Sequence, residues 1–281
     1  MEEKKYVTED GEHKEDVIVS WIITHGCQER CAYCISPEKC KEITDYETHK
    51  AIQDQMIATG LTKNRYIGGE PLLIPHIGKL IREAKEAGLN TRLSTNGIAL
   101  TKEKLIELRD YLNSVAFPFE SANDELNQSI RGTKNHREIV SSRIRMIHEL
   151  APHLGILVNT CVHKENIHEL EELAYLLEDL GIDHWKLRKF NSSSGRGAVP
   201  NKNRFEISEE EFFETVDHLK SLGLSYRMDG RLPSKLNTRL MVSPQGELYR
   251  MIGGDDEQVH YGNVLTKKLN IREIYKRDGC N

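Results

Sequence analysis

Three cysteines near the start of the chain have the spacing of a metal site. Cys27, Cys31 and Cys34 lie in the run HGCQERCAYC, with the pattern Cys-x3-Cys-x2-Cys and an aromatic residue, Tyr33, directly before the third. Thiolates this close together on one loop can converge on one metal centre. An iron–sulfur cube is ordinarily held by four protein thiolates, and a closed zinc site also has four ligands. A set of three therefore leaves one metal position open to a ligand that is not protein.

Two further runs follow predicted strands. Gly68, Gly69 and Glu70 begin the run GGEP, and two glycines at a strand end let a ligand approach the backbone closely. An ordinary strand-ending turn is the alternative. Ser94 and Asn96 belong to the run LSTNG, which also reads as a plain Asn-Gly turn.

These motifs together resemble the radical S-adenosylmethionine (SAM) enzymes. In that family three such cysteines hold a [4Fe–4S] cluster, and SAM chelates the fourth iron through its amino and carboxylate groups. The aromatic residue before the third cysteine commonly packs on the adenine, which implies that role for Tyr33. The GGEP run is similar to a family motif whose backbone contacts the SAM amino group, which implies that Gly68, Gly69 and Glu70 position SAM.

The resemblance implies four more SAM contacts. Family members often place a polar side chain near the SAM ribose or carboxylate where Ser94 and Asn96 lie. Arg131, in the run ending SIRG, matches an arginine that can meet the SAM carboxylate, a good partner for a guanidinium. Pro118 departs from the serine usual in the family, and a solvated Arg131 is the alternative. Asn159 matches an asparagine that faces the ribose, or else it pairs with neighbouring backbone.

The resemblance also implies the reaction. An external one-electron reductant of flavodoxin or ferredoxin type reduces the cluster, and bound SAM is cleaved to methionine and a 5′-deoxyadenosyl radical. That radical abstracts hydrogen from a substrate held in the barrel, while the protein binds, orients and excludes water.

The run WKLRKF carries the prediction about the substrate. Alternation places Lys186 and Arg188 on one face of a strand and Trp185 and Leu187 on the other. If the apolar pair packs on helices, the two cations face the barrel interior, where a bare charge is costly. An anionic substrate, the SAM carboxylate, a salt bridge or solvation would offset that cost. Arg196 resembles a loop arginine of related enzymes and is a third candidate.

Three hypotheses about the function follow. We predict an anionic small-molecule substrate such as a nucleotide, because residues 194–213 also have some similarity to viperin-like nucleotide dehydratases. The alternative is modification of a ribosomally made peptide, since the C-terminal stretch resembles a SPASM/twitch extension. Met251 occupies the position of an auxiliary-cluster cysteine there and only Cys280 follows, so a single cluster is predicted. The third hypothesis is a non-enzymatic binding module stabilised by zinc, with Cys40 as the fourth ligand beside Cys27, Cys31 and Cys34.

The elements that position these residues alternate between strand and helix. Strand-like runs lie at residues 17–23, 65–67, 91–94, 114–119, 155–162 and 184–190, and helical patterns at 46–59, 76–87, 101–112, 136–150 and 166–180. This alternation predicts an α/β fold with a parallel sheet. The cysteines then fall at the C-terminal edge of the first strand, where functional groups gather.

The resemblance specifies a (β/α)6 partial barrel with parallel strands plus a small C-terminal α+β extension. We divide the chain into a charged tail (1–15), a partial-barrel core (16–190) and an extension that closes the barrel (191–281). In the extension we expect a polar loop, a helix at 208–222 with the capping box Ser208–Glu211, and a strand pair at 238–242 and 247–251.

Composition limits the remaining possibilities. The 281 residues are 38% hydrophobic and 30% charged with a net charge of −5, which argues against the broad basic face of a nucleic-acid binder. No apolar run approaches the roughly 18 residues of a membrane helix, and the N-terminus has no signal-peptide pattern. The six cysteines then read as reduced thiols or metal ligands, with Cys161 a buried thiol. We expect a cytoplasmic protein without membrane or nucleic-acid partners.

Overall fold

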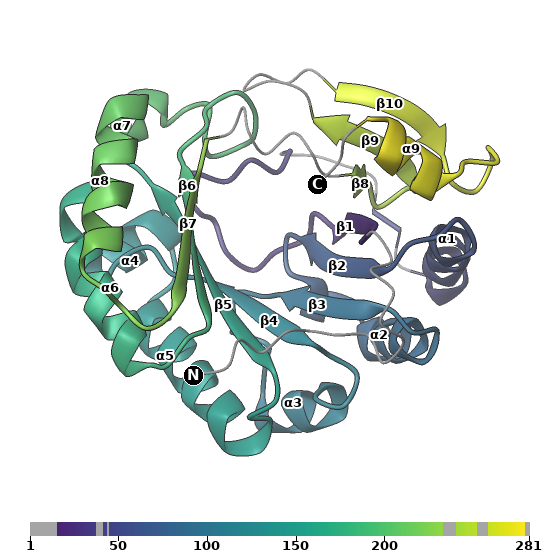
Figure 1. The fold of residues 1–281 in the computed structure, drawn as a ribbon, viewed down its shortest axis with the longest axis horizontal. Coiled ribbons are helices and arrows are strands. Elements are labelled where there is room, and N and C mark those ends of the chain that lie inside the picture. Colours follow the sequence, from purple (N-terminus) through teal and green to yellow (C-terminus); the bar gives the residue numbers. More distant parts are fainter. Residues whose placement is uncertain (1–15, 38–41, 44, 233–239, 252–257, 279–281) are drawn as a thin grey trace.

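A single curved sheet with helices on its outer face makes up the fold (Figure 1). The structure is a computed structural model that describes residues 16–37, 42–43, 45–232, 240–251 and 258–278. In this described part of the chain, ten strands follow the order β10-β9-β8-β1-β2-β3-β4-β5-β6-β7. The strands from β8 through β1 to β7 are parallel, and β9 and β10 are antiparallel additions.

The elements alternate along the chain as far as β6. The strands are β1 (Ile18–Thr24), β2 (Lys63–Gly68), β3 (Asn90–Ser94), β4 (Ser114–Pro118), β5 (Gly155–Val162), β6 (His184–Lys189), β7 (Arg227–Arg231), β8 (Leu240–Val242), β9 (Glu247–Met251) and β10 (Gln258–Asn263). The helices are α1 (Tyr46–Ala58), α2 (Ile77–Glu86), α3 (Lys102–Leu108), α4 (Asp124–Arg131), α5 (His136–Leu150), α6 (Leu170–Asp179), α7 (Lys202–Phe205), α8 (Glu209–Ser221) and α9 (Ile271–Arg277), with 3₁₀ turns η1 (Pro71–Leu73) and η2 (Ile167–Glu169).

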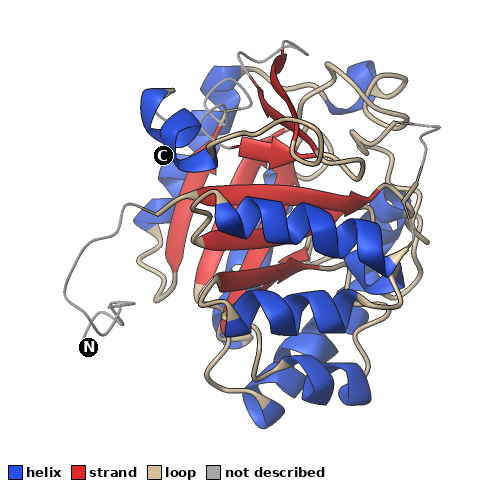
Figure 2. Cartoon of the chain, turned by 90° about the vertical axis from the view of Figure 1, so that its right-hand side faces the viewer, coloured by secondary structure: helices blue, strands red, loops and turns tan. Residues whose placement is uncertain are grey.

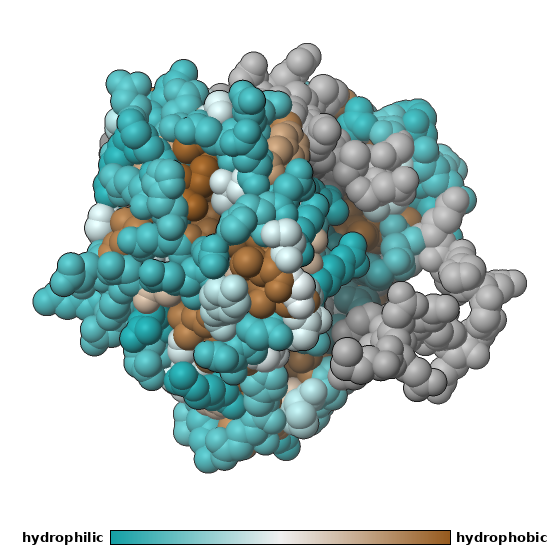
Figure 3. Space-filling model, turned by 60° about the vertical axis from the view of Figure 1, so that its left-hand side comes forward, coloured by the Kyte–Doolittle hydropathy of each residue, from teal (hydrophilic) through white to brown (hydrophobic). Residues whose placement is uncertain are grey.

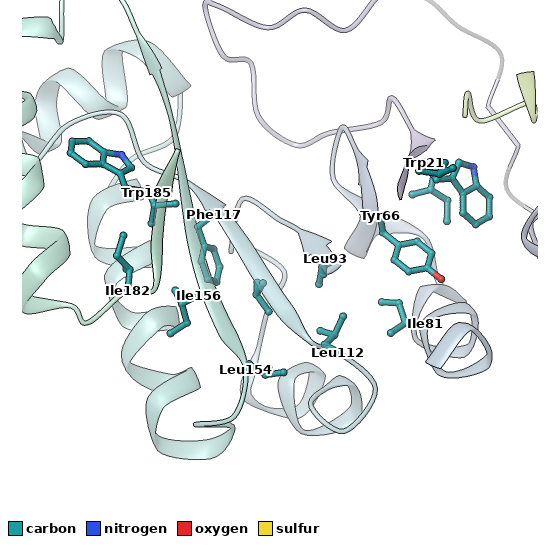
Figure 4. Packing of buried hydrophobic residues seen from close by; sticks show 14 of the residues in the cluster. Trp21, Tyr66, Ile81, Leu93, Leu112, Phe117, Leu154, Ile156, Ile182 and Trp185 are labelled. Atoms are coloured by element: carbon teal, nitrogen blue, oxygen red, sulfur yellow. The ribbon is translucent and has the colours of Figure 1, made fainter. Parts of the chain in front are cut away.

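The core lies between the convex face of the sheet and the helices. Trp21, Tyr66, Phe117 and Trp185 extend outward from their strands and are fully buried there (Figure 4). Burial of such side chains is the main force that holds helices on a sheet. Successive residues of a strand point to opposite faces of the sheet. The residues directly before and after each of these aromatic residues therefore line the concave face.

The sequence prediction of an α/β fold with parallel strands is confirmed. Each predicted strand run up to residue 190 corresponds to one of β1–β6, and helices cover the outer face in the side view as well (Figure 2). The capping box at the start of α8 is present, with Ser208 and Glu211 each bonded to the other's backbone N–H.

The C-terminal residues extend the sheet at both ends. β7 adds a seventh parallel strand beside β6, and β8 pairs in parallel with β1, on the other side of the sheet. Within the described part of the chain, β7 and β10 are the two edges, so no hydrogen-bonded ladder joins the ends of the sheet. The division at residue 190 stays a prediction.

The surface is mixed in character. The face in Figure 3 is mainly hydrophilic, with hydrophobic side chains gathered in separate small areas. Among the described residues, no helix is both long and apolar enough to span a lipid bilayer.

Candidate functional site

The segment that follows β1, residues 25–36, is named the cysteine loop here. Cys27, Cys31 and Cys34 lie on it and are half-buried. The backbone N–H of Gly69 donates to Thr24 O at 2.7 Å, and that of Glu70 donates to Gly26 O at 2.8 Å. A Cβ on Gly69 would collide with the Gly26 carbonyl, so only glycine allows this approach. The structure therefore brings the GGEP run directly against the cysteine loop.

Glu70 joins this edge to the turn after β3. Its buried carboxylate accepts hydrogen bonds from Leu72 N (3.0 Å), Thr95 Oγ1 (2.9 Å) and Asn96 N (2.7 Å). Burial, only partly offset by these hydrogen bonds, raises the pKa of Glu70 to about 7. Asn96 Nδ2 in turn lies 3.8 Å from Cys27 Sγ. Three separate sequence motifs thus meet at one edge of the sheet.

The loop after β6 packs on the other side of the cysteine loop. The N–H groups of Gly197 and Ala198 donate to Cys34 O at 3.0 and 3.2 Å, and Asn201 Nδ2 donates to Ala32 O at 3.0 Å. A Cβ on Gly197 would collide with the backbone of the cysteine loop. This loop therefore shapes the cysteine loop, in addition to lying near the mouth of the sheet.

Arg196 lies in the same loop. Its N–H donates to Ser36 O at 2.9 Å, which holds it beside the cysteine loop. Its side-chain Nε is buried and makes no hydrogen bond within the described residues. The predicted anion-binding role of Arg196 stays a prediction, and its position beside the cysteines is compatible with it.

Arg131 is buried rather than solvated, so the alternative of a solvated side chain is wrong. Its guanidinium is paired with Glu29 and, at 3.1 Å, with Glu120. Its Nη1 also donates to the Tyr33 hydroxyl at 2.5 Å, and that hydroxyl donates to Glu120 at 2.5 Å. Sequence reasoning missed both carboxylates. An acidic residue between two closely spaced cysteines was the available signal for Glu29.

The three thiols have a donor set that fits an iron–sulfur cluster. Cys27 Sγ accepts a hydrogen bond from Glu29 N at 3.4 Å, and such N–H···S bonds are a usual feature around cluster sulfurs. Burial raises the pKa of Cys27, and it raises that of Cys31 to about 12, so a bound cation would be needed to keep the thiolates charged. Among the described residues, no group of three His, Cys, Asp or Glu side chains is close enough together to hold a single metal ion. Cys40 and Cys280 lie outside the described residues.

The alternation predicted for β6 is confirmed. Trp185 and Leu187 are fully buried under the helices, whereas Lys186 and Arg188 face the concave side with 7% and 17% exposure. Arg188 Nη1 is 2.9 Å from Asp229 Oδ1 on β7, so the salt bridge to a neighbouring strand is present.

Further arginines share the concave face with these two cations. We name the whole set the cationic group: Arg65 on β2, Arg92 on β3, Lys186 and Arg188 on β6, and Arg231 on β7. Burial, then repulsion from Arg92, lowers the pKa of Arg65 to about 9, with smaller contributions from Arg231 and Arg188. Within the described chain Arg65 Nη1 is buried without a hydrogen-bond partner. An arginine keeps its proton in proteins even where burial lowers its pKa. The buried guanidinium of Arg65 therefore stays charged and can bind an anion.

Asp229 partly balances the cationic group. Its carboxylate lies 2.7 Å from His184, 2.9 Å from Arg188 and 3.4 Å from Arg231. The hydrogen bonds from His184 and Arg188 outweigh burial and hold the pKa of Asp229 well below its usual range. One carboxylate is therefore shared between two arginines and a histidine.

Two other predicted positions line the same face. Ser94 ends β3, and Asn159 on β5 lies in register with Lys186; both are half-buried. Cys161, two residues on, is half-buried and packs against a small apolar cluster of Ile130, Phe190, Ala198 and Phe205.

Comparison with known proteins gives relatives along most of the chain. A family model described as the radical SAM superfamily matches residues 21–177. An S-adenosylmethionine-dependent nucleotide dehydratase from Flammeovirga pacifica is 29% identical over 276 residues, which cover 94% of this chain and 91% of that protein. A PqqA peptide cyclase from Bradyrhizobium diazoefficiens is 30% identical over 166 residues, which cover 57% of this chain and 43% of the cyclase.

Solved structures share the fold. Streptococcus suis SuiB bound to S-adenosylmethionine superposes with a TM-score of 0.71 at 13% identity, over 92% of this chain and 65% of SuiB. Native anSMEcpe with bound AdoMet gives a TM-score of 0.71 at 12% identity, over 90% of this chain and 79% of that one. At such identities the likeness establishes the partial-barrel fold alone. The family model covers more than half of the chain, and the chain therefore belongs to the radical SAM superfamily, an enzyme family whose cofactors are a [4Fe–4S] cluster and SAM.

Proposed function

We propose that this enzyme acts on a nucleotide, which it holds on the concave face through the cationic group. The observation that carries the proposal is the buried Nη1 of Arg65, which has no hydrogen-bond partner among the described residues and lies near other cations. A nucleotide phosphate chain would supply the missing acceptors and charge. The match along nearly the whole length of a nucleotide dehydratase supports the same substrate class.

The cysteine loop is proposed to hold the cluster through Cys27, Cys31 and Cys34. When bound, the cluster and SAM supply the 5′-deoxyadenosyl radical that abstracts hydrogen from the substrate. The chain's own part is to orient both ligands and to exclude water.

SAM binding is assigned to the edge of the sheet around the cysteine loop. The N–H groups of Gly69 and Glu70 are already bonded to the loop, so an ammonium group would find its acceptors in carbonyl oxygens of this run. Tyr33, Ser94 and Asn159 are proposed to border the adenosine part of SAM. These assignments rest on the family motif and on the adjacency of the three runs.

A binding experiment tests the substrate class. We expect nucleoside triphosphates to bind the reconstituted enzyme and to stimulate SAM cleavage, and nucleosides to do neither. The Arg65→Met variant should bind the triphosphate about tenfold or more weakly, because one charge-assisted hydrogen bond contributes about 1.5–3 kcal/mol. Arg145→Met, at a 61% exposed position on α5, is the matched control and should bind like the wild type. Equal triphosphate affinity for both variants would refute the assignment.

Modification of a peptide is the second candidate. The 30% identity to a PqqA peptide cyclase favours it, although this chain matches less than half of that protein's length. A peptide substrate predicts SAM cleavage stimulated by a peptide and indifferent to triphosphates.

We also propose an external one-electron reductant of flavodoxin or ferredoxin type. The free thiols of the cysteine loop need a reducing compartment, which supports a cytoplasmic location. The zinc-module alternative does not fit the enzyme family to which the chain belongs.

A further inference from the structure

One buried arginine links several parts of the site. Arg131 is the last residue of α4, and its side chain is 4% exposed. One edge of its guanidinium forms a two-point contact with Glu29, with Nη2 against Oε2 and Nε 3.3 Å from Oε1. Its Nη1 lies 3.1 Å from Glu120, and both carboxylates are only 1% exposed. We name these three residues and Tyr33 the Arg131 network.

The partners of Arg131 come from two parts of the chain: Glu29 and Tyr33 lie on the cysteine loop, and Glu120 follows β4. Glu29 lies between Cys27 and Cys31, its N–H donates to Cys27 Sγ, and its Oε2 is 3.8 Å from Cys31 Sγ. The guanidinium therefore reaches the immediate surroundings of two of the three thiols through one carboxylate.

Glu120 ties the network to the sheet. It follows β4, and its Oε2 accepts a hydrogen bond from the N–H of Cys161 on β5 at 2.8 Å. Its Oε1 accepts the Tyr33 hydroxyl at 2.5 Å. The backbone beside Arg131 adds a separate link, because Ile130 O accepts the N–H of Ala32 at 2.8 Å. The cysteine loop is thus fastened to α4, β4 and β5 at one point.

The charges of the network leave little capacity for another anion. Two buried carboxylates already flank a single guanidinium, and bulk water has little access to either ion pair because the Arg131 side chain is only 4% exposed. A third carboxylate would be repelled by these two, and the contacts named above already use four of the five N–H groups of the guanidinium.

We propose that Arg131 is a positioning residue that fixes the cysteine loop through Glu29 and Tyr33, and that it does not bind the SAM carboxylate. The inference rests on the proposed assignment of the three cysteines as cluster ligands. Its consequence is that Arg131 governs how firmly the cluster is held, while SAM affinity depends on other groups.

The test compares Arg131→Met, Glu29→Gln and the double variant in reconstituted enzyme. We expect each single change to speed the loss of iron to a chelator about tenfold or more. The double variant should lose iron no faster than Arg131→Met, since both changes remove the same interaction. Among chains that retain the cluster, the dissociation constant for SAM should change less than about threefold.

Two controls separate positioning from general stability. Arg204→Met breaks an ion pair with Glu165, 2.7 Å long, and should lose iron at the wild-type rate, because the Arg204 side chain hydrogen-bonds in the described chain to Glu165 and Ser129, outside the cysteine loop. Arg131→Lys keeps the positive charge but lacks the paired N–H groups of the guanidinium. This variant should lose iron at an intermediate rate and have normal SAM affinity. It also serves if Arg131→Met does not fold.

Three results would overturn the inference. These are normal iron retention with SAM binding weakened tenfold or more in either Arg131 variant, additive effects in the double variant, and equally fast iron loss in Arg204→Met. Failure of the wild-type chain to take up iron would instead overturn the proposed cluster assignment.

Discussion

Replacing Glu70 by glutamine should make the protein more stable at neutral pH while removing an anchor of the SAM site. Glu70 is fully buried, and its pKa is raised from 4.5 to about 7 because burial disfavours the charged carboxylate. At about 1.4 kcal/mol per unit of pKa, this difference corresponds to about 3 kcal/mol.

The sign follows from which state holds the proton more tightly. The folded protein does, so as the pH rises the unfolded chain releases this proton first. The stabilisation from the raised pKa is complete below pH about 4.5 and is lost as the pH rises to about 7. An amide cannot ionise, so the Glu70→Gln variant should lack this pH dependence. The free energies of unfolding should therefore be similar near pH 4.5 and should favour the variant by up to about 3 kcal/mol at pH 8.

Urea unfolding followed by tryptophan fluorescence measures the free energy of unfolding at each pH, because Trp21 and Trp185 are both buried in the folded protein. Glu138→Gln, at a 64% exposed position, is the control and should follow the wild type at every pH. The hydrogen bonds that the ionised carboxylate accepts from Leu72, Thr95 and Asn96 act in the opposite direction. If losing one acceptor dominated, the variant would be about 1–3 kcal/mol less stable at pH 8, and the reasoning from burial would be refuted.

Four other substitutions probe the site. Asp229→Asn removes a carboxylate shared by Arg188 and Arg231, so inorganic tripolyphosphate should bind about fivefold more tightly by calorimetry; weaker binding would mean that Asp229 instead holds these arginines in place. Gly197→Ala places a methyl group against the cysteine loop and should lower the iron content per chain after reconstitution, and a wild-type content would contradict the close packing. Cys34→Ser should prevent formation of a normal cluster by EPR, whereas Cys161→Ser should retain the wild-type spectrum; a cluster lost with Cys161 would revise the ligand set.

The alternation of strands and helices could be predicted because buried runs carry their own signal. Residues such as Trp21 and Trp185 alternate with concave-face residues, which identifies both the strand and its buried side. β7 could not be found this way, since its sequence RMDGR places charges at alternate positions. Its Gly230 packs against Val216 of α8, where a larger side chain would collide, so burial there leaves no apolar pattern.

The position of a site residue could be predicted where the residue belongs to a short motif directly after a strand. The cysteines and the GGEP run could be placed together because the ends of adjacent parallel strands share an edge. The partners of Arg131 could not, since Glu29 lies 102 residues away in the chain and is brought to it only by packing. The same holds for the cationic group, whose members come from four strands.

Transfer of deuterium tests the central claim most directly. The reduced, reconstituted enzyme would be incubated with SAM and a nucleoside triphosphate deuterated throughout the ribose, and 5′-deoxyadenosine would be analysed by mass spectrometry. We predict that it gains deuterium from the nucleotide, and that Arg65→Met lowers this gain at a subsaturating nucleotide concentration. Unlabelled 5′-deoxyadenosine with every nucleotide, together with deuterium gained from a labelled peptide, would contradict a nucleotide substrate.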